Sequence, residues 1–564
     1  MSKTFAWLVY LFAATFFGCF FLWPIGVTLT GAFLDADRKF TWDFVAEVFR
    51  NRIYIEGLRN AFVLAVGSTA VSLAIAMPLA FVADRFEFPG KKLLSAAILV
   101  PMILPPFVGA IGVRQIFGQY GAFNAMLARM GLLGPHDTID WLGHHRMAGI
   151  IALNALHLYP IFFLNLTAAL ANLDPSMEEA AENLGCTGLR RFRRITLPLI
   201  MPGLFAGGVI VFIFAFTELG VPLIFDFSRV TSVQIFYGIK EIAGNPFPFA
   251  LVVVMLASTA LLYAAGKLAF GRSAMTMTSK AVTASGTRRV GTLGKWLCAG
   301  AFAGITVLAL LPHAGVVLVS FAGSWYQSIL PTEWTADHYR VALGHSLAVP
   351  SIINSLKYAS ASTLFDLILG VAIAYVIVRT TLPGRGLLDA LAMLPLAVPG
   401  LVLAFGYISM TQEGRAFQFL NPSRDPTILL IIAYAVRRLP YVVRSAVAGL
   451  EQTSVTLEEA AQNLGCPPLR ALWRITFPLI AANVLAGGLL AFSFAMLEVS
   501  DSLILAQKQQ NFPITKAIYE LFQLMGEGRF VASALGVWAM LFLGVAIFAV
   551  SRMLGKKLGA LFRV

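Results

Sequence analysis

Two glutamates stand inside long apolar segments of this 564-residue sequence, where a charged side chain is costly. They are Glu218 and Glu498, 280 positions apart, and Asp501 follows the second of them. An ionisable residue at the depth of a lipid bilayer is expensive and by default marks a path for a solute or an ion. Carboxylates in such a path would favour a hard cation.

A pair of arginines interrupts another apolar segment. Arg437 and Arg438 precede Leu439-Pro440, and the residue 280 positions before Arg437 is His157. Guanidinium groups would favour a phosphate-bearing solute. Two interpretations stay open at this point. Either all these ionisable residues line a translocation path, or the glutamates lie near the external interface while the arginines pair with acids and hold helices together.

Sequence patterns for enzymatic chemistry are absent. No G-x4-G-K-[ST] nucleotide-binding pattern occurs, and neither does a CxxC or HExxH metal spacing or a nucleophile elbow. The four cysteines do not suggest a disulfide framework. We therefore expect a chain that is not an enzyme and that has no metal site and no cofactor of its own.

The composition indicates an integral membrane protein. Hydrophobic residues make up 58% of the chain and charged residues only 13%, about half the share in a soluble protein. The net charge of +13 is explained by basic loops beside anionic lipid, so we expect the bilayer as a partner and no nucleic acid.

Apolar segments long enough to cross a bilayer recur along the whole chain. A spanning helix needs about 20 mainly apolar residues, and the first segment lacks a cleavage site, so it reads as an uncleaved span. We expect an all-α integral membrane protein with about 12 transmembrane helices. The candidate spans are 5–31, 61–83, 93–117, 147–170, 199–224, 247–270, 296–322, 355–378, 387–410, 427–449, 479–505 and 530–551.

The chain is an internal duplication. Asn60, Pro101 and Pro105 reappear 294 positions later as Asn354, Pro395 and Pro399. We expect a first six-helix half over 1–271 (core 57–271) and a second over 295–564 (core 351–552). Residues 272–294, rich in Ser, Thr, Gly and basic residues, read as a flexible linker.

A polar loop with one pattern, E-A-A-x3-G-x9-I-x-[LF]-P, lies between apolar spans in each half. Alanines permit close approach to a partner, glycine permits a turn, glutamate offers a charge, and proline can begin the next helix. The matching residues are Glu179, Ala180, Ala181, Gly185, Ile195 and Pro198 in the first copy, and Glu459, Ala460, Ala461, Gly465, Ile475 and Pro478 in the second.

This duplicated loop resembles the loop of ABC-importer permeases that docks on cytoplasmic ATPase subunits. The resemblance implies the permease of a type I ABC importer, in which the loop follows the ATPase as it closes on ATP and switches the helix bundle. It implies as partners two copies of a cytoplasmic ABC ATPase, which would hold ATP and magnesium, and a periplasmic or lipid-anchored solute-binding protein.

The substrate cue is a second resemblance. The fused length, the run Thr217-Glu218-Leu219-Gly220 and the run from Lys240 to Ala250 look like permeases for ferric iron. The second half has Val499-Ser500-Asp501 after Glu498, so symmetric ligation by both halves is not expected. Similar fused permeases are linked to 2-aminoethylphosphonate, thiamine and polyamine. An ion-driven secondary transporter is the rival class, but it does not explain the duplicated loop.

Short basic loops set the expected orientation. Arg85 with Lys91-Lys92, and the run from Arg190 to Arg194, favour the cytoplasmic side. We expect a multi-pass protein of a bacterial inner membrane with both termini in the cytoplasm.

Overall fold

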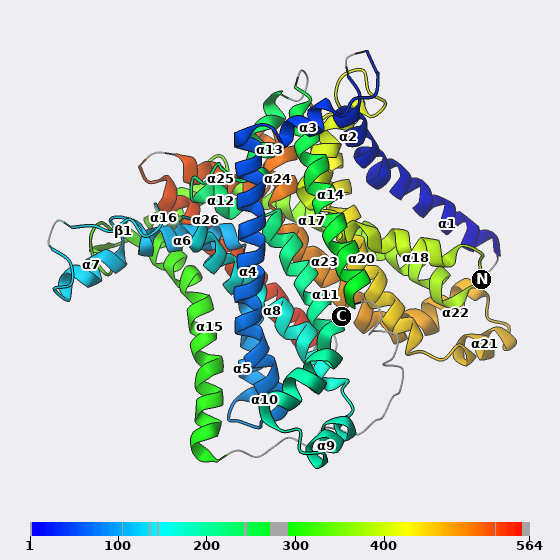
Figure 1. Ribbon diagram of the computed structural model, residues 1–564. Helices are drawn as coiled ribbons and strands as arrows, with labels where there is room; N and C mark the ends of the chain where they lie inside the picture. Colours follow the sequence, from blue (N-terminus) through cyan, green and yellow to red (C-terminus); the bar gives the residue numbers. More distant parts are fainter. Residues whose placement is uncertain are drawn as a thin grey trace. The chain divides into compact units, whose positions relative to one another are not determined.

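The computed structural model describes residues 3–35, 37–103, 105–134, 137–143, 146–241, 245–270, 291–524 and 526–554. Most of these residues are helical, and a two-stranded antiparallel sheet, β1 (Ala322–Ser324) and β2 (Glu333–Trp334), is the sheet found among them. Figure 1 shows the elements along the chain. The expected all-α membrane fold is confirmed.

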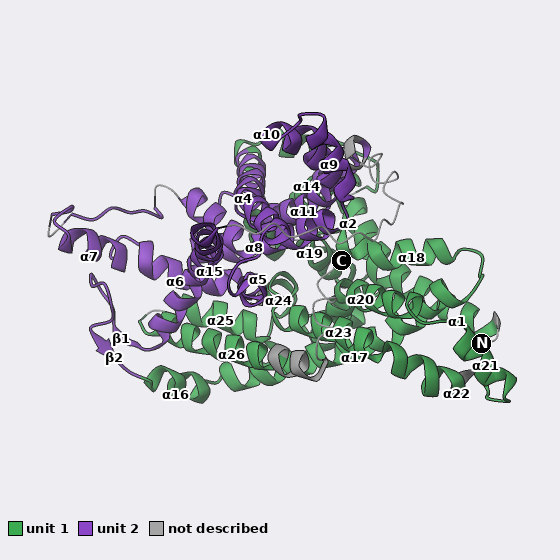
Figure 2. Cartoon of the chain, turned by 90° about the horizontal axis from the view of Figure 1, so that it is seen from below, with its two compact units in different colours: residues 1–55, 233–256, 336–562 green, residues 56–232, 257–335, 563–564 purple. Residues whose placement is uncertain are grey.

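The chain forms two compact units, coloured separately in Figure 2. Unit 1 comprises residues 1–55, 233–256 and 336–562, and unit 2 comprises residues 56–232, 257–335 and 563–564. The units do not coincide with the two sequence halves, because the first helix of each half belongs to the unit that holds the core of the other half.

The helices of unit 1 come mainly from the second half. They are α1 (Lys3–Phe17), α2 (Trp23–Phe33), α3 (Asp43–Val48), α16 (Asp337–Gly344), α17 (Ala348–Arg379), α18 (Arg385–Met393), α19 (Gly400–Met410), α20 (Thr427–Glu451), α21 (Thr456–Asn463), α22 (Pro468–Ala471), α23 (Phe477–Met496), α24 (Ser500–Leu505), α25 (Ile514–Gln523) and α26 (Gly528–Leu554), with most of α13 (Thr231–Gly238) and the first part of α14 (Phe247–Phe270). Its centre is the mutual packing of α17, α20 and α23.

The helices of unit 2 come mainly from the first half. They are α4 (Arg52–Arg85), α5 (Lys91–Ala97), α6 (Pro106–Phe117), α7 (Ala122–Arg129), α8 (Arg146–Ala171), α9 (Pro175–Asn183), α10 (Gly188–Arg191), α11 (Leu197–Phe216), α12 (Gly220–Ile224) and α15 (Thr292–Ser320). Here α8 packs on α11, and α15 packs on α6. Residues 272–290 of the predicted linker lie outside the described residues, and 292–294 begin α15.

The number of helices that can cross a membrane agrees with the expectation of about twelve. Among the described residues nine helices are long and apolar enough, and two bent pairs bring the number to eleven. The 25-residue helix α20 is a further candidate, although Arg437, Arg438 and Arg444 lower its apolar character.

The third and ninth predicted spans are bent and do not form straight helices. Residues 91–102 and 106–129 meet at 91°, and residues 385–396 and 400–410 meet at 99°. At each break a proline, Pro105 or Pro399, has an extended ψ of 128° or 138° and begins the next helix. Proline removes a backbone donor and disfavours the helical conformation in the residue before it, so the break follows from the sequence.

Each bent span is crossed by the first helix of the other half at a glycine. A Cβ on Gly112 of α6 would lie 2.3 Å from the carbonyl oxygen of Pro312 in α15. A Cβ on Gly406 of α19 would lie 2.8 Å from the carbonyl oxygen of Pro24 in α2. Gly112 and Gly406 are 294 positions apart, so the close helix crossing is duplicated with the sequence.

We expect Gly112→Ala and Gly406→Ala each to lower the free energy of unfolding by about 1–3 kcal/mol, because the added methyl group would meet backbone atoms that must move. Thermal unfolding of the purified protein in detergent measures the effect. Gly300→Ala in α15 and Gly26→Ala in α2 are matched controls, since nothing lies within 4 Å of a Cβ at either position. Equal melting temperatures for all four variants would contradict the close crossing.

Candidate functional site

The two repeated loops each contain a short helix, and the helix of the first loop has a side-chain cap at its start. In α9 the Asp174 carboxylate caps the helix by accepting from the Ser176 backbone N–H (2.9 Å), and these hydrogen bonds lower the pKa of Asp174. Pro175 occupies the first turn, where its missing N–H costs little. The sequence Asp174-Pro175-Ser176 therefore determines where α9 begins.

Both loop helices end in the same glycine turn. Gly185 and Gly465 have φ values of +75° and +84°, in the left-handed region that favours glycine. The Cys186 N–H donates to the carbonyl of Ala181 at 2.8 Å, and the Cys466 N–H donates to that of Ala461 at 3.0 Å. This is the Schellman end of a helix, so the predicted turn at each glycine has a backbone reason.

The buried acid of the first loop is Glu178, the residue before the predicted Glu179. Its side chain is 6% exposed and accepts from Arg85 at 2.5 and 2.6 Å and from the Thr196 hydroxyl at 2.6 Å. Arg85 is the last residue of α4, and Thr196 lies just before α11. Glu178 therefore joins the loop helix to two membrane helices of unit 2.

The second loop repeats the link to an arginine in unit 1, but Thr476, the counterpart of Thr196, has no hydrogen-bond partner among the described residues. Glu458 is buried and accepts from Arg379 Nε at 3.1 Å and from the Tyr375 hydroxyl at 3.4 Å. Arg379 is the last residue of α17, and it also donates to the carbonyl and hydroxyl oxygens of Thr453 at 2.8 Å. We call the pairs Arg85–Glu178 and Arg379–Glu458 the tethers.

Opposing effects act on the pKa of Glu178. Burial alone would raise the pKa, but the hydrogen bonds from Arg85 and Thr196, together with the charges of Arg85 and Arg191, outweigh it and lower the pKa below its usual 4.5. The tether of unit 2 is therefore formed by an ionised carboxylate at neutral pH.

The remaining pattern residues of the loops divide between two faces. Glu179, Ala180 and Gly185, like Glu459, Ala460 and Gly465, are exposed, whereas Ala181 and Ala461 are buried against their own unit. Ile195 and Ile475 are half-buried, and Pro198 and Pro478 are exposed in the first turn of α11 and α23. The outward face also presents Leu184 and Leu464, which are 87% and 89% exposed.

The charged residues predicted within the second half come together in unit 1. Arg437 donates to Glu498 at 2.7 Å and to Asp501 at 3.1 Å, and Arg438 donates to the other oxygen of Glu498 and to the Phe494 carbonyl. We call these four ionisable residues the arginine cluster. It ties α20 to the break between α23 and α24, which matches the interpretation in which arginines pair with acids.

The guanidinium of Arg437 depends on a glycine for its space. A Cβ on Gly400, the first residue of α19, would lie 2.2 Å from Arg437 Nη1. In the first half the matching positions are Pro106 and His157. Gly400 and Arg437 therefore occur together in the second half, and the first half has neither residue at the matching positions.

The predicted residues of the first half lie in unit 2. Glu218 follows the end of α11 and accepts from the Val221 N–H at 3.1 Å, so it caps the short helix α12. Glu498 lies at the equivalent break before α24 and is 3.4 Å from the Asp501 N–H. His157 Nδ1 donates to the carbonyl of Pro101 at 2.9 Å, near the bend in the third span.

Three buried acids were not among the residues predicted from the sequence: Glu178 and Glu458 in the loops, and one carboxylate within a membrane span. Glu178 and Glu458 are 280 apart, and their partners Arg85 and Arg379 are 294 apart, so the repeat itself contained the signal. Asp366 is an acid inside the eighth predicted span. The rule applied to Glu218 and Glu498 would have identified it.

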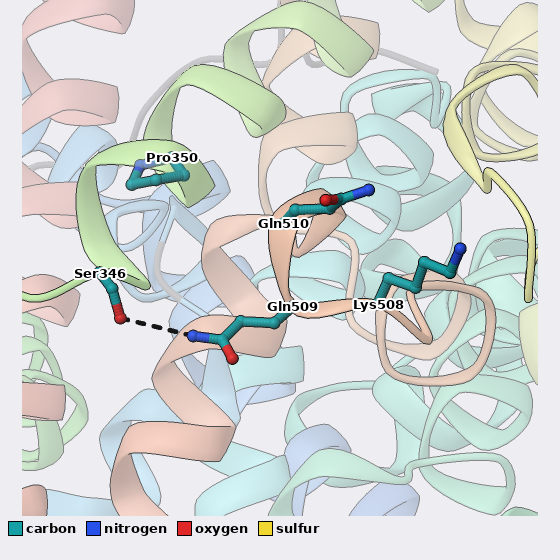
Figure 3. Close-up of a pocket in the computed structure, with 5 residues that line it drawn as sticks. All are labelled: Ser346, Pro350, Lys508, Gln509 and Gln510. Carbon is teal, nitrogen blue, oxygen red and sulfur yellow. Dashed lines mark hydrogen bonds between the residues drawn. The ribbon is translucent and has the colours of Figure 1, made fainter.

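An open polar cavity of about 490 Å³ lies at the start of α17, at the end of that helix remote from its tether. Figure 3 shows Gln509 directed at Ser346, with Nε2 3.4 Å from the hydroxyl. Lys508 donates to the carbonyl of Arg424 at 2.9 Å. Pro350 and Gln510 complete the lining.

The chain matches known proteins over most of its length. The model of the family "binding-protein-dependent transport system inner membrane component" matches residues 76–273 and 346–559. The ferric transport system permease protein FbpB of Actinobacillus pleuropneumoniae is 29% identical over 472 residues, which cover 81% of this chain and 64% of that protein. The match therefore spans just under two thirds of the length of that relative.

Two further comparisons extend the set. A putative ferric transport system permease protein, FbpB 1, of Haemophilus influenzae is 28% identical over 511 residues, covering 86% of this chain and 76% of that protein. A solved bacterial ABC transporter involved in the import of the acidic polysaccharide alginate aligns with a TM-score of 0.37 and 17% identity, covering 47% of this chain and 99% of that one.

We expect Glu178→Gln and Glu458→Gln to loosen the two loop helices, because each change leaves a charged arginine without its anion at a cost of about 1–3 kcal/mol. Hydrogen exchange of the α9 and α21 amides should rise by about tenfold or more. Glu179→Gln and Glu459→Gln are matched controls, since these neighbours are exposed. If the controls loosen the helices as much as the tether variants, the tethers do not hold the loops.

The same tether should respond to pH in one direction. Because the pKa of Glu178 is lowered in the folded protein, its contribution to stability is present above the pKa of the unfolded chain. That contribution is lost as the pH falls below about 4.5 and through the folded pKa. Exchange in α9, corrected for the intrinsic rate, should therefore increase over that window, and Glu178→Gln should abolish the increase.

Proposed function

Because this chain belongs to the family of binding-protein-dependent transport system inner membrane components, we propose that it is the permease of an ATP-driven importer. It receives solute from a binding protein outside the membrane and releases it into the cytoplasm by alternating access. The observation that carries this proposal is the duplicated loop helix. Each copy is tethered by a buried acid to a membrane helix and presents an exposed apolar residue outward.

The tethers give the loops a mechanical role. Glu178 is bound to the last residue of α4, and Glu458 to the last residue of α17, so a displacement of a loop helix is passed to a membrane helix. α4 has 34 residues and α17 has 32, which at 1.5 Å per residue is about 50 Å, more than a bilayer core. Movement at one membrane surface can therefore reach the opposite one.

The exposed faces of α9 and α21 are the proposed contacts with the motor. Leu184 and Leu464 leave water when a partner covers them, and Glu179 and Glu459 offer charges to a basic rim. Two copies of a cytoplasmic ABC ATPase, one for each loop, fit the duplication. ATP and magnesium would bind to those subunits.

The tethers also set the proposed orientation. Placing α9 and α21 in the cytoplasm puts the start of α17, with its polar cavity, on the outer side, where the binding protein would dock. The N- and C-termini would then lie in the cytoplasm. The basic residues from Arg190 to Arg194 beside the first loop support this orientation.

Ferric iron is the proposed solute. The two relatives reported above are named for ferric transport, and the run of residues from Thr217 to Gly220 carries the same resemblance. The alternatives, 2-aminoethylphosphonate, thiamine and polyamine, are distinguished by the solute that the cognate binding protein retains on purification. Retention of an organic solute in place of iron would overturn the choice of ferric iron.

We expect Leu184→Glu and Leu464→Glu to abolish co-purification of the ATPase and to reduce ATP-dependent uptake at least tenfold, because each places a charge in an apolar contact. Since both side chains are exposed, the melting temperature of the permease alone should not change. Asn183→Ser and Asn463→Ser, at exposed neighbouring positions, are the controls. Uptake that persists without any ATPase would instead favour an ion-driven transporter.

The native cysteines of the loops test the orientation. Cys186 and Cys466 are half-exposed, and in a Cys19→Ser, Cys298→Ser background they are the remaining thiols. A membrane-impermeant maleimide should label them in inside-out vesicles and leave them unlabelled in intact spheroplasts. Labelling from the outside would place both loops on the wrong side for a cytoplasmic motor.

A further inference from the structure

A buried carboxylate without a partner lies in the centre of unit 1. Asp366, in the interior of α17, is 0% exposed, and neither of its carboxyl oxygens has a hydrogen-bond partner in the described part of the chain. An unpaired polar group in such a place costs free energy. A partner that arrives in another conformation would remove this cost.

Arg438 is the cation in a position to become that partner. It lies on α20, which packs on α17, and its positive charge acts on Asp366. In the present structure one Nη of Arg438 serves Glu498 and the Phe494 carbonyl, while its Nε has no partner among the described residues. The guanidinium is therefore only partly used.

The arginine cluster can lose Arg438 without leaving Glu498 alone. Arg437 donates to both Glu498 and Asp501, so Glu498 keeps a cation when Arg438 turns away. With Asp366 included, two arginines serve three buried carboxylates. Two guanidinium groups cannot fully pair with three carboxylates at once. The contact that Arg438 makes decides which carboxylate lacks a full ion pair.

We propose that Asp366 is the second partner of Arg438, and that Arg438 exchanges Glu498 for Asp366 when the bundle of α17, α20 and α23 changes conformation during transport. Asp366 is thus a positioning residue, and this inference rests on the proposed function. In one conformation Arg438 of α20 pairs with Glu498, at the break before α24. In the other it pairs with Asp366, in the middle of α17, so each conformation has its own ion pair.

A bound metal ion is a poorer explanation for Asp366. The positive charge of Arg438 opposes a cation at this position, and the described residues contain no group of three or more His, Cys, Asp or Glu that could hold a metal. A side chain already nearby and already charged needs no additional ligand.

The first half provides a natural control for this device. The residues matching Asp366 and Arg438 are Ser72 and Leu158, and the Ser72 hydroxyl donates to the carbonyl of Ala155 at 3.4 Å within unit 2. The first half therefore lacks both charges, and the exchange is confined to the second half.

The test uses the full permease reconstituted in proteoliposomes with its ATPase and its binding protein loaded with Fe(III). We expect Asp366→Asn to lower iron uptake at least tenfold, Asp366→Glu to recover part of it, and Ser72→Ala to stay within about twofold of the parent. The melting temperature of the resting Asp366→Asn complex should not fall, because the carboxylate has no partner to lose there.

A double-mutant cycle separates an exchange from a static role. In uptake, Asp366→Asn combined with Arg438→Gln should be no worse than the poorer single variant. In thermal unfolding of the resting complex, the two effects should add. If Arg438→Gln does not fold, Arg438→Lys takes its place in the cycle.

The outcomes identify which idea fails. Unchanged uptake in Asp366→Asn, or a lowered melting temperature in both Asp366 variants, overturns the exchange while the importer remains. Absence of ATP-dependent iron uptake in the parent complex itself overturns the proposed iron importer.

Discussion

A buried charge in or beside a membrane is costly unless it has a partner, and this cost accounts for several main features of the structure. Glu178 and Glu458 are buried at the ends of α4 and α17 because arginines stand there to receive them. Glu498 is buried because two arginines reach it from α20. Removing one member of such a pair costs more than the pair contributes, so each pair fixes the helices that carry it.

The class of the protein and the glycine turn in each repeated loop could be predicted from the sequence. Apolar length predicts the spans, and the resemblance to importer permeases is confirmed by the family match over both halves. The sequence did not indicate which of two adjacent glutamates faces inward, because Glu178 and Glu179 are chemically identical. The choice of the inward glutamate depends on where α4 ends, because Arg85 at that end binds Glu178. Glu178 is three residues before the buried Ala181, so both lie on the same face of α9. The crossing of Gly112 and Pro312 was likewise hidden, because pairing between distant helices leaves no local pattern.

The two halves share a framework and differ in charge. The bent spans, the glycine crossings, the tethers and the glycine turns all occur twice, whereas the arginine cluster and Asp366 occur once. Gly400, which makes room for Arg437, replaces the Pro106 of the first half. The shared features include the two loop helices and the ion pairs that hold them, and the unshared ones lie within the membrane-spanning part.

The crossing of α15 over α6 also bears on biogenesis. Nine of the helices given above for unit 2 come from the first half, and the tenth is α15, which the ribosome produces only with residues 292–320. A translation product that stops in the segment after α14 would insert its apolar helices yet leave Gly112 of α6 without the backbone of α15 that packs against it. Membrane proteases would degrade such a fragment as an incomplete helix bundle. Because the two halves are joined in one polypeptide, α15 is always made after the helices that it packs against.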